Sequence, residues 1–90
     1  GTVFLVVALV GSAIACDEAD FIKLLKTKKC PSCKLAKCQL AGEYLQGADL
    51  RGADLREADL TGAKLTWTEL GYATWTNGRK CKADSIGKCK

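Results

Sequence analysis

Leucine recurs at every fifth position through the middle of the chain. The eight positions are Leu35, Leu40, Leu45, Leu50, Leu55, Leu60, Leu65 and Leu70. On an α-helix, five residues advance the chain by about 500°, so these side chains would spiral around the axis and form no stripe. On a flat strand an odd spacing alternates between faces, so half of the leucines would face water. The spacing therefore favours a solenoid that turns about a quarter circle per five residues, with every leucine on one axis.

A small residue stands two positions before most of these leucines. The run 48–62 reads ADLRG-ADLRE-ADLTG and shows the five-residue unit plainly. This unit resembles the pentapeptide-repeat family, whose consensus is Ala-(Asp/Asn)-Leu-x-x. The resemblance covers Cys33 to about Asn77 and is strict from Ala48 to Leu65. It implies an all-β solenoid, a short right-handed quadrilateral β-helix with four repeats per coil over residues 30–78. The leucine and the small residue would point inward, and the other three positions outward.

Four units per coil place same-face neighbours twenty residues apart. We therefore expect three outward pairs to stack: Lys34 near Asp54, Tyr44 near Lys64, and Asp49 near Glu69. Polar residues occupy the small inward position in two units, at Glu43 and Thr68.

Two aromatic residues occupy the last outward position of their units. Trp67 and Tyr72 would lie above Gly47 and Gly52. Exposed aromatic side chains over glycines are explained either by packing of the C-terminal tail or by contact with a partner. The candidate partner-contact residues are Trp67, Tyr72, Arg79, Lys80 and Lys82.

A solenoid exposes an open edge and a core at each end, so both ends need a cover. Residues 16–29 predict a capping segment, with an amphipathic helix over 17–29 whose apolar face comprises Phe21, Ile22, Leu24 and Leu25. Acidic residues in its first turn and lysines in its last turn suit the helix dipole. A helix lying on a bilayer surface is the alternative. At the other end Trp75 should act as a lid. Residues 79–90 should form a disulfide-closed basic cap with Ile86 tucked inside.

Residues 1–15 are apolar or small and carry no charge. The fourteen residues of the apolar run reach about 21 Å as a helix, short of the roughly 30 Å hydrocarbon core. We expect the exit half of a membrane anchor whose first turns lie upstream. A cleaved signal peptide ending at Ala13-Ile14-Ala15 is the alternative, and Cys16 is a candidate for lipidation in an envelope lipoprotein. Every interpretation places the domain on the exported, periplasmic side of a bacterial membrane.

The six cysteines are expected to form disulfides, the default in an exported protein. We expect the pairs Cys30–Cys33 and Cys81–Cys89, which match the two places where the resembling proteins carry cysteine. Cys38 falls on a small inward position, which predicts a buried residue with a free thiol. A Cys33–Cys38 bridge is an alternative. Two weaker alternatives are a redox dithiol at Cys30 and Cys33 and a thiolate metal site that uses Cys30, Cys33, Cys38 and Cys81.

No group of residues predicts catalysis, since the chain has no histidine and no nucleophile beside a base. We expect no enzyme, no cofactor, no metal and no small-molecule substrate. The resemblance also implies DNA mimicry by a long acidic β-helix in the DNA channel of a topoisomerase. This chain departs from that pattern, because it is short, exported and carries a net charge of +4. No nucleic-acid partner is expected.

Two function hypotheses follow. The first is a membrane-anchored accessory subunit that packs against a larger membrane protein complex, with electron-transfer or photosynthetic complexes as guesses from topology. The alternative is a free-standing envelope lipoprotein or secreted repeat protein, with the lipid on Cys16.

Overall fold

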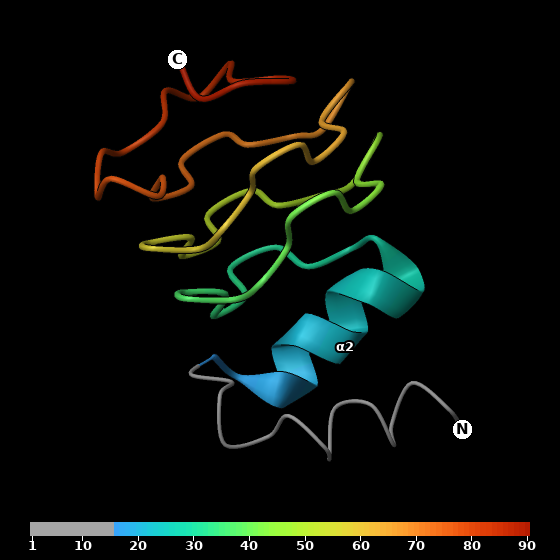
Figure 1. Ribbon diagram of the computed structural model, residues 1–90. Coiled ribbons are helices and arrows are strands. Elements are labelled where there is room, and N and C mark those ends of the chain that lie inside the picture. Colours follow the sequence, from blue (N-terminus) through green and yellow to red (C-terminus); the bar gives the residue numbers. More distant parts are fainter. Residues whose placement is uncertain (1–15) are drawn as a thin grey trace.

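The computed structural model describes residues 16–90, which form one α-helix followed by a stack of coils (Figure 1). Helix α2 (Glu18–Thr27) lies within the predicted segment 17–29. Asp17 caps its N-terminus, where the side chain accepts a hydrogen bond from the Asp20 N–H at 3.0 Å. Lys28 caps the C-terminus of the helix: its backbone is left-handed, and its N–H donates to the Leu24 carbonyl. The chain then enters the first coil directly.

The coils stack through parallel bridges between residues twenty positions apart. The bridges are Lys29–Asp49, Lys34–Asp54, Gln39–Asp59, Tyr44–Lys64, Asp49–Glu69 and Asp54–Thr74. Twenty residues correspond to four five-residue units per coil, which is the register predicted from the sequence. Each side of a coil contributes one bridging residue, so residues 16–90 contain isolated bridges and no longer strand. The predicted β-helix type of architecture is therefore built from very short sides.

A tight turn separates one side of the coil from the next. The leucine carbonyl of one unit accepts a hydrogen bond from the N–H of the next small residue, as in Ala53 to Leu50 at 3.0 Å. The residue before the small position has a positive φ, for example 71° at Gly52. This is the geometry of a turn that favours glycine at its third position. The five-residue period therefore alternates a short extended side with a turn.

The core is a column of small and leucine side chains along the axis. The leucines from Leu35 to Leu55 are fully buried, as are Ala48, Ala53 and Ala73. Helix α2 covers the first coil with Leu24, which is fully buried, and with Phe21 and Leu25, which pack against the core. Thr68 takes a small inward position without an orphaned hydroxyl, because its Oγ1 donates to the Leu45 carbonyl at 2.7 Å. Each buried leucine contributes about 2 kcal/mol.

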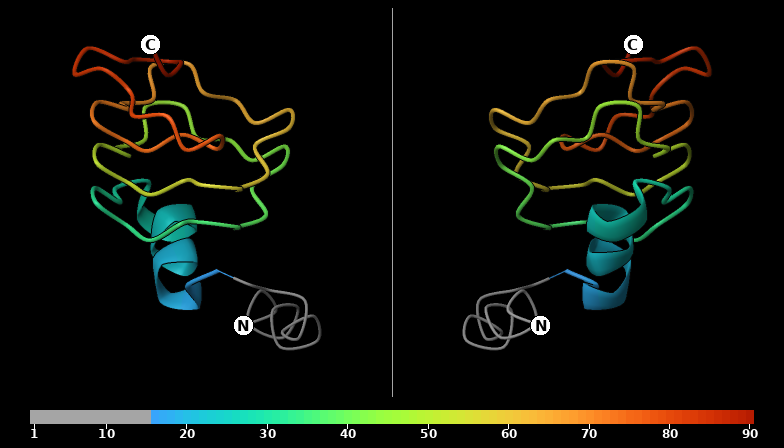
Figure 2. Two further views of the ribbon diagram at one scale, coloured as in Figure 1. Left: turned by 90° about the vertical axis from the view of Figure 1, so that its left-hand side faces the viewer. Right: turned by 90° about the vertical axis from the view of Figure 1, so that its right-hand side faces the viewer.

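The C-terminal segment 79–90 folds back over part of the last coil (Figure 2). It forms antiparallel bridges from Ile86 to Glu69 and from Lys80 to Thr74. Trp75 is half-buried and packs against the core, as expected for a lid. The expectation that Ile86 is tucked inside was wrong, since its exposed fraction is 50%. Its backbone pairs with the last coil while its side chain stays outside.

The predicted anchor or signal segment, residues 1–15, lies outside the described residues. Within residues 16–90 no helix has both the length and the apolar character that a membrane span requires.

Candidate interaction surface

All six cysteines are paired, and one pair was not predicted. Cys30 bonds to Cys33 and Cys81 to Cys89, as expected, with Cα–Cα distances of 5.3 and 4.9 Å. The expectation of a free thiol at Cys38 was wrong, because Cys38 bonds to Cys16 across a Cα–Cα distance of 5.0 Å. A thioether-linked lipid on Cys16 needs the same sulfur atom. Lipidation and this disulfide therefore exclude each other.

The disulfides also remove the two weaker cysteine chemistries from this state of the protein. A metal site at Cys30, Cys33, Cys38 and Cys81 needs thiolates, and all four sulfur atoms are in disulfides. No cluster of metal-ligating side chains occurs in the described part of the chain. The Cys30–Cys33 pair is also almost fully buried, so an attacking thiolate has little access.

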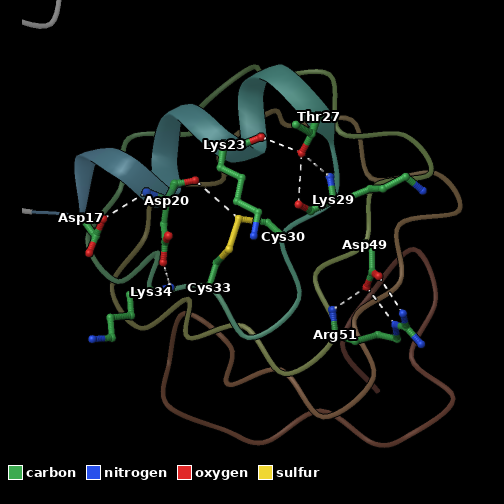
Figure 3. The surroundings of a disulfide bond; sticks show 10 residues. All are labelled: Asp17, Asp20, Lys23, Thr27, Lys29, Cys30, Cys33, Lys34, Asp49 and Arg51. Atoms are coloured by element: carbon green, nitrogen blue, oxygen red, sulfur yellow. Dashed lines mark hydrogen bonds and ion pairs between the residues drawn. A yellow bond between two sulfur atoms is a disulfide. The ribbon is translucent and has the colours of Figure 1, made fainter.

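Hydrogen bonds around the Cys30–Cys33 disulfide join helix α2 to the first coil (Figure 3). The Asp20 carboxylate accepts from the Lys34 N–H at 2.7 Å. At the other end of the helix, the Thr27 hydroxyl donates to the Lys23 carbonyl and accepts from the Lys29 N–H at 3.0 Å. These contacts fix the helix on the end of the solenoid, so this region is structural.

Two outward aspartates form bidentate ion pairs with the arginine two residues later. Arg51 Nε and Nη2 donate to Asp49 at 2.8 and 2.7 Å (Figure 3), and Arg56 repeats the geometry on Asp54 at 2.9 and 2.7 Å. Hydrogen bonding from the arginine side chain lowers the pKa of each aspartate, with backbone hydrogen bonding and the arginine charge adding to the shift. Both carboxylates stay ionised at neutral pH and brace the turn that follows them. The geometry suits a surface brace and not an acid or base.

Trp67 and Tyr72 are the candidate contact residues whose aromatic side chains stay exposed, although Trp67 borders Ile86 and Gly87 of the C-terminal segment. Both side chains are exposed, with fractions of 74% and 62%. Both also have a φ of 63°, in the left-handed region where a bulky residue is an outlier. This backbone conformation costs on the order of 1–2 kcal/mol for a residue with a side chain. Glycine holds four of the nine corresponding positions, and Ser32, Lys37 and Glu57 share the positive φ. The strain is therefore common to the repeat, and Trp67 and Tyr72 differ from the other positions by their large exposed aromatic side chains.

Tyr72 stands at the corner that Ser32 and Gly52 occupy in the two earlier coils. The three positions stack because the Ser32 N–H bonds the Arg51 carbonyl and the Gly52 N–H bonds the Gly71 carbonyl. A Cβ added at Gly52 would lie 3.2 Å from Ser32 Oγ, so the middle of the corner is already tightly packed. The residues here enclose only a shallow hollow, lined by Pro31, Ser32, Arg51, Gly52, Gly71 and Tyr72.

Trp67 stands at the neighbouring corner and forms one wall of a larger groove. The groove has a volume of about 550 Å³. Its lining combines the last unit on this side with the C-terminal segment: Ala63, Leu65, Thr66, Trp67, Ile86 and Gly87. The sequence predicted Trp67 as a surface residue but not the groove. The only sequence signal for it is that the repeats stop at Asn77-Gly78, before another complete coil has formed.

The basic candidates lie elsewhere on the same end. Arg79 and Lys80 follow the side of the coil that carries Thr74, and Arg79 Nη2 donates to the Cys89 carbonyl at 3.0 Å. Lys82 is exposed on the C-terminal segment, but it does not line the groove. The structure therefore brings Trp67 together with Ile86 and not with the predicted basic residues.

The comparisons with known proteins agree with this geometry. Comparison with curated proteins and with solved structures found no significant match. A family model described as pentapeptide repeats matches eight copies over residues 33–71. The matched segment contains the units that stack at a spacing of twenty residues. The central repeat segment of this chain, residues 33–71, therefore belongs to the pentapeptide-repeat family.

Proposed function

We propose that the protein is a non-catalytic interaction module that packs, on the exported side of a membrane, against a larger protein assembly. The observation that carries this proposal is the pair of exposed aromatic residues, Trp67 and Tyr72, at neighbouring corners of the last coil. Large exposed aromatic side chains are the residues that most often dominate protein interfaces.

The exported location is supported by the three disulfides, which form and persist in oxidising compartments. The apolar segment 1–15 supports attachment to a membrane, as the exit half of an anchor. We further infer that the coils form a right-handed, four-sided β-helix with α2 as its cap. The four-unit spacing of the bridges and the burial of Leu24 support this finer description.

A non-catalytic role is supported by the groups that fill the interior. The axis holds leucine, alanine and disulfide sulfur, and every buried side-chain nitrogen or oxygen in residues 16–90 has a hydrogen-bond partner. A binding site for a small molecule usually needs a deep apolar pocket with a few convergent polar groups. The two hollows described above lie at the surface instead.

Native mass spectrometry of a gentle detergent extract from the source membranes tests the proposal. We expect the chain inside a larger complex, at a mass that includes residues 1–15, and we expect Trp67→Ala to weaken that association. The chain found alone, with an acylated Cys16 as its first residue, would instead establish an envelope lipoprotein. That form would also lack the Cys16–Cys38 disulfide and carry a free thiol at Cys38.

A further inference from the structure

The C-terminal segment covers only part of the last coil. Its backbone bonds to the side that carries Thr68 and Leu70, with distances of 2.8 Å from the Gly87 N–H to the Thr68 carbonyl and 2.9 Å from the Leu70 N–H to the Ser85 carbonyl. It also bonds to the next side, where the Cys81 N–H donates to the Ala73 carbonyl at 2.8 Å. The two remaining sides belong to the units 58–62 and 63–67, and no backbone bond to the C-terminal segment reaches them.

These two sides leave an unpaired sheet edge. One coil earlier, the N–H groups of Leu40, Gly42 and Leu45 all donate to the next coil, at 2.8 to 2.9 Å. The equivalent N–H groups are those of Leu60, Gly62 and Leu65. Within residues 16–90 they have no backbone acceptor.

The carbonyl groups of the same edge are also unpaired. Cys38 and Glu43 accept from the N–H groups of the next coil at 2.9 Å. Their equivalents, Ala58 and Ala63, have no backbone donor among the described residues. With the Trp67 N–H, whose equivalent at Gly47 donates to the Thr66 carbonyl, the edge offers four N–H groups and two carbonyls in the spacing of a coil that residues 16–90 do not supply.

The side chains along this edge are incompletely covered as well. Leu40 and Leu45 are fully buried, whereas Leu60, Leu65 and Ala63 are only partly buried. The groove beside Leu65 is bounded by Trp67 and Ile86, both largely exposed. Apolar side chains beside unpaired backbone groups are the features that let a sheet edge accept an added strand.

We propose that this edge binds an acidic segment of a partner protein, which follows the turn at Gly62 and adds to the units 58–67 as the next two sides of the coil. The proposal rests on the interaction role proposed above and specifies the partner's chemistry. Backbone hydrogen bonds to Leu60, Gly62 and Leu65 fix the segment. Its apolar side chains cover the partly buried leucines, and its acidic side chains point outward.

The charge around the edge selects an acidic segment over a second copy of this chain. Lys64 is exposed on one open side, and the half-buried Asp59 on the other accepts a hydrogen bond from the Thr61 N–H at 3.0 Å. The C-terminal segment 79–90 carries five basic residues and one acidic residue, Asp84, which Lys90 already binds at 3.2 Å. Two copies meeting end to end would bring two basic segments together, which is unfavourable. An acidic segment is attracted to the same surface.

The test titrates the full, oxidised chain in detergent with a capped octapeptide of alternating glutamate and valine, observed by amide NMR. We expect saturable shifts and slowed amide exchange at Leu60, Gly62 and Leu65, with Leu40 and Leu45 unchanged. A capped lysine–valine octapeptide is the matched probe and should bind at least about tenfold more weakly. Absence of shifts at the three edge amides, or equal binding of the two peptides, overturns the proposal.

Two variants with the same change in charge locate the effect. Lys64→Glu should lower the affinity for the glutamate–valine peptide by about fivefold. Lys23 is exposed on helix α2 at the opposite end of the stack, so Lys23→Glu should leave the affinity for the peptide unchanged. If the edge amides become protected with rising protein concentration and without peptide, the occupant is a second copy and the acidic segment is wrong.

The outcomes separate this inference from the proposed function. Peptide binding by a chain that is found alone in the source membranes overturns the assembly proposal and leaves the edge site standing. A chain found in a larger complex but insensitive to the peptide overturns the edge site alone.

Discussion

The two ends of the stack of coils are closed to different extents. At the N-terminal end, α2 lays Leu24 over the first coil, and Leu35, Leu40 and Leu45 are fully buried beneath it. The Cys16–Cys38 disulfide ties the chain before the helix to the same coil. At the C-terminal end, Leu70 is fully buried under the returning segment, but Leu60 and Leu65 are not.

This difference shows that the same repeat unit contributes either to the core or to a surface, depending on whether another coil is stacked on it. A leucine in the middle of the stack is core because another coil lies above it. The same leucine two units before the repeats stop becomes part of a surface. The covered end is built for stability, and the half-open end has the features of a binding site.

The largest expected contrast comes from two leucines in one column. Leu45 and Leu65 are twenty residues apart and share a side, since Tyr44 bridges to Lys64. Leu45→Asp places a charge inside the closed region and should unfold the domain. Leu65→Asp places it at the open end and should lower the free energy of unfolding by only about 1–2 kcal/mol. Denaturant unfolding followed by circular dichroism measures both, and equal losses would show that the two ends are equally closed.

Removing a disulfide should reduce stability by different amounts at the two ends. Replacing Cys16 and Cys38 together by alanine should cost about 3 kcal/mol, because that bond closes a separation of 22 residues. Replacing Cys81 and Cys89 should cost about 1 kcal/mol less, since their separation is 8. Thermal unfolding of both oxidised double variants gives the order. The reverse order would show that the C-terminal segment depends on its bond more than the cap does.

Trp67 should be removable without loss of stability. Trp67→Gly relieves the left-handed strain and gives up little burial, so the free energy of unfolding should stay the same or rise by about 1 kcal/mol. Gly47→Ala, one coil below, is the matched control. Its φ is 71° with open space around a new Cβ, so it should lose about 1 kcal/mol through strain alone. A lower free energy of unfolding in Trp67→Gly would show that Trp67 packs against the C-terminal segment and stabilises the fold.

The smallest expected effect is a loss of stability in acid. It arises on the two sides of the stack that carry Asp49 and Asp54, which are the sides that the C-terminal segment covers. The folded-state pKa values of Asp49 and Asp54 are lowered by their arginines. The ion pairs therefore stabilise the fold fully above about pH 5, and this stabilisation is lost as the pH falls below about 4. Because both arginine side chains are largely exposed to solvent, the loss should be a few tenths of a kcal/mol. In the double variant Asp49→Asn, Asp54→Asn, the free energy of unfolding should lack this dependence on pH. Denaturant unfolding between about pH 3 and pH 7, which includes the range where aspartates titrate, measures the difference.

The register of the solenoid was predictable because it depends only on the period of the sequence. Four units per coil fixed the stacking of Lys34 on Asp54 and of Tyr44 on Lys64, and the structure has both bridges. The inward positions followed from the same period, with Ala53 and Leu55 fully buried. Each unit repeats one local geometry, so local pattern and global fold agree.

The ends were less predictable because the period stops there. The sequence placed Cys38 inward but could not show that, in the first coil, an inward side chain also faces the chain that leads into α2. That geometry brings Cys16 to it. The half-open end escaped prediction for a related reason. Where residues 79–90 return is decided by their antiparallel bridges to Glu69 and Thr74, which no repeat encodes.

The uniform spacing of the bridges has a consequence for the order of folding. Each parallel bridge joins residues twenty positions apart, so every coil closes a loop of the same length and meets a similar entropic cost. The bridges between coils join residues separated by roughly 0.2 of the chain length, and such non-local pairing slows folding relative to a helical bundle of the same size. Each new coil needs the preceding one as its template. The capped end also leaves the ribosome first, so we expect the coils to form in order from α2 toward the open edge during synthesis.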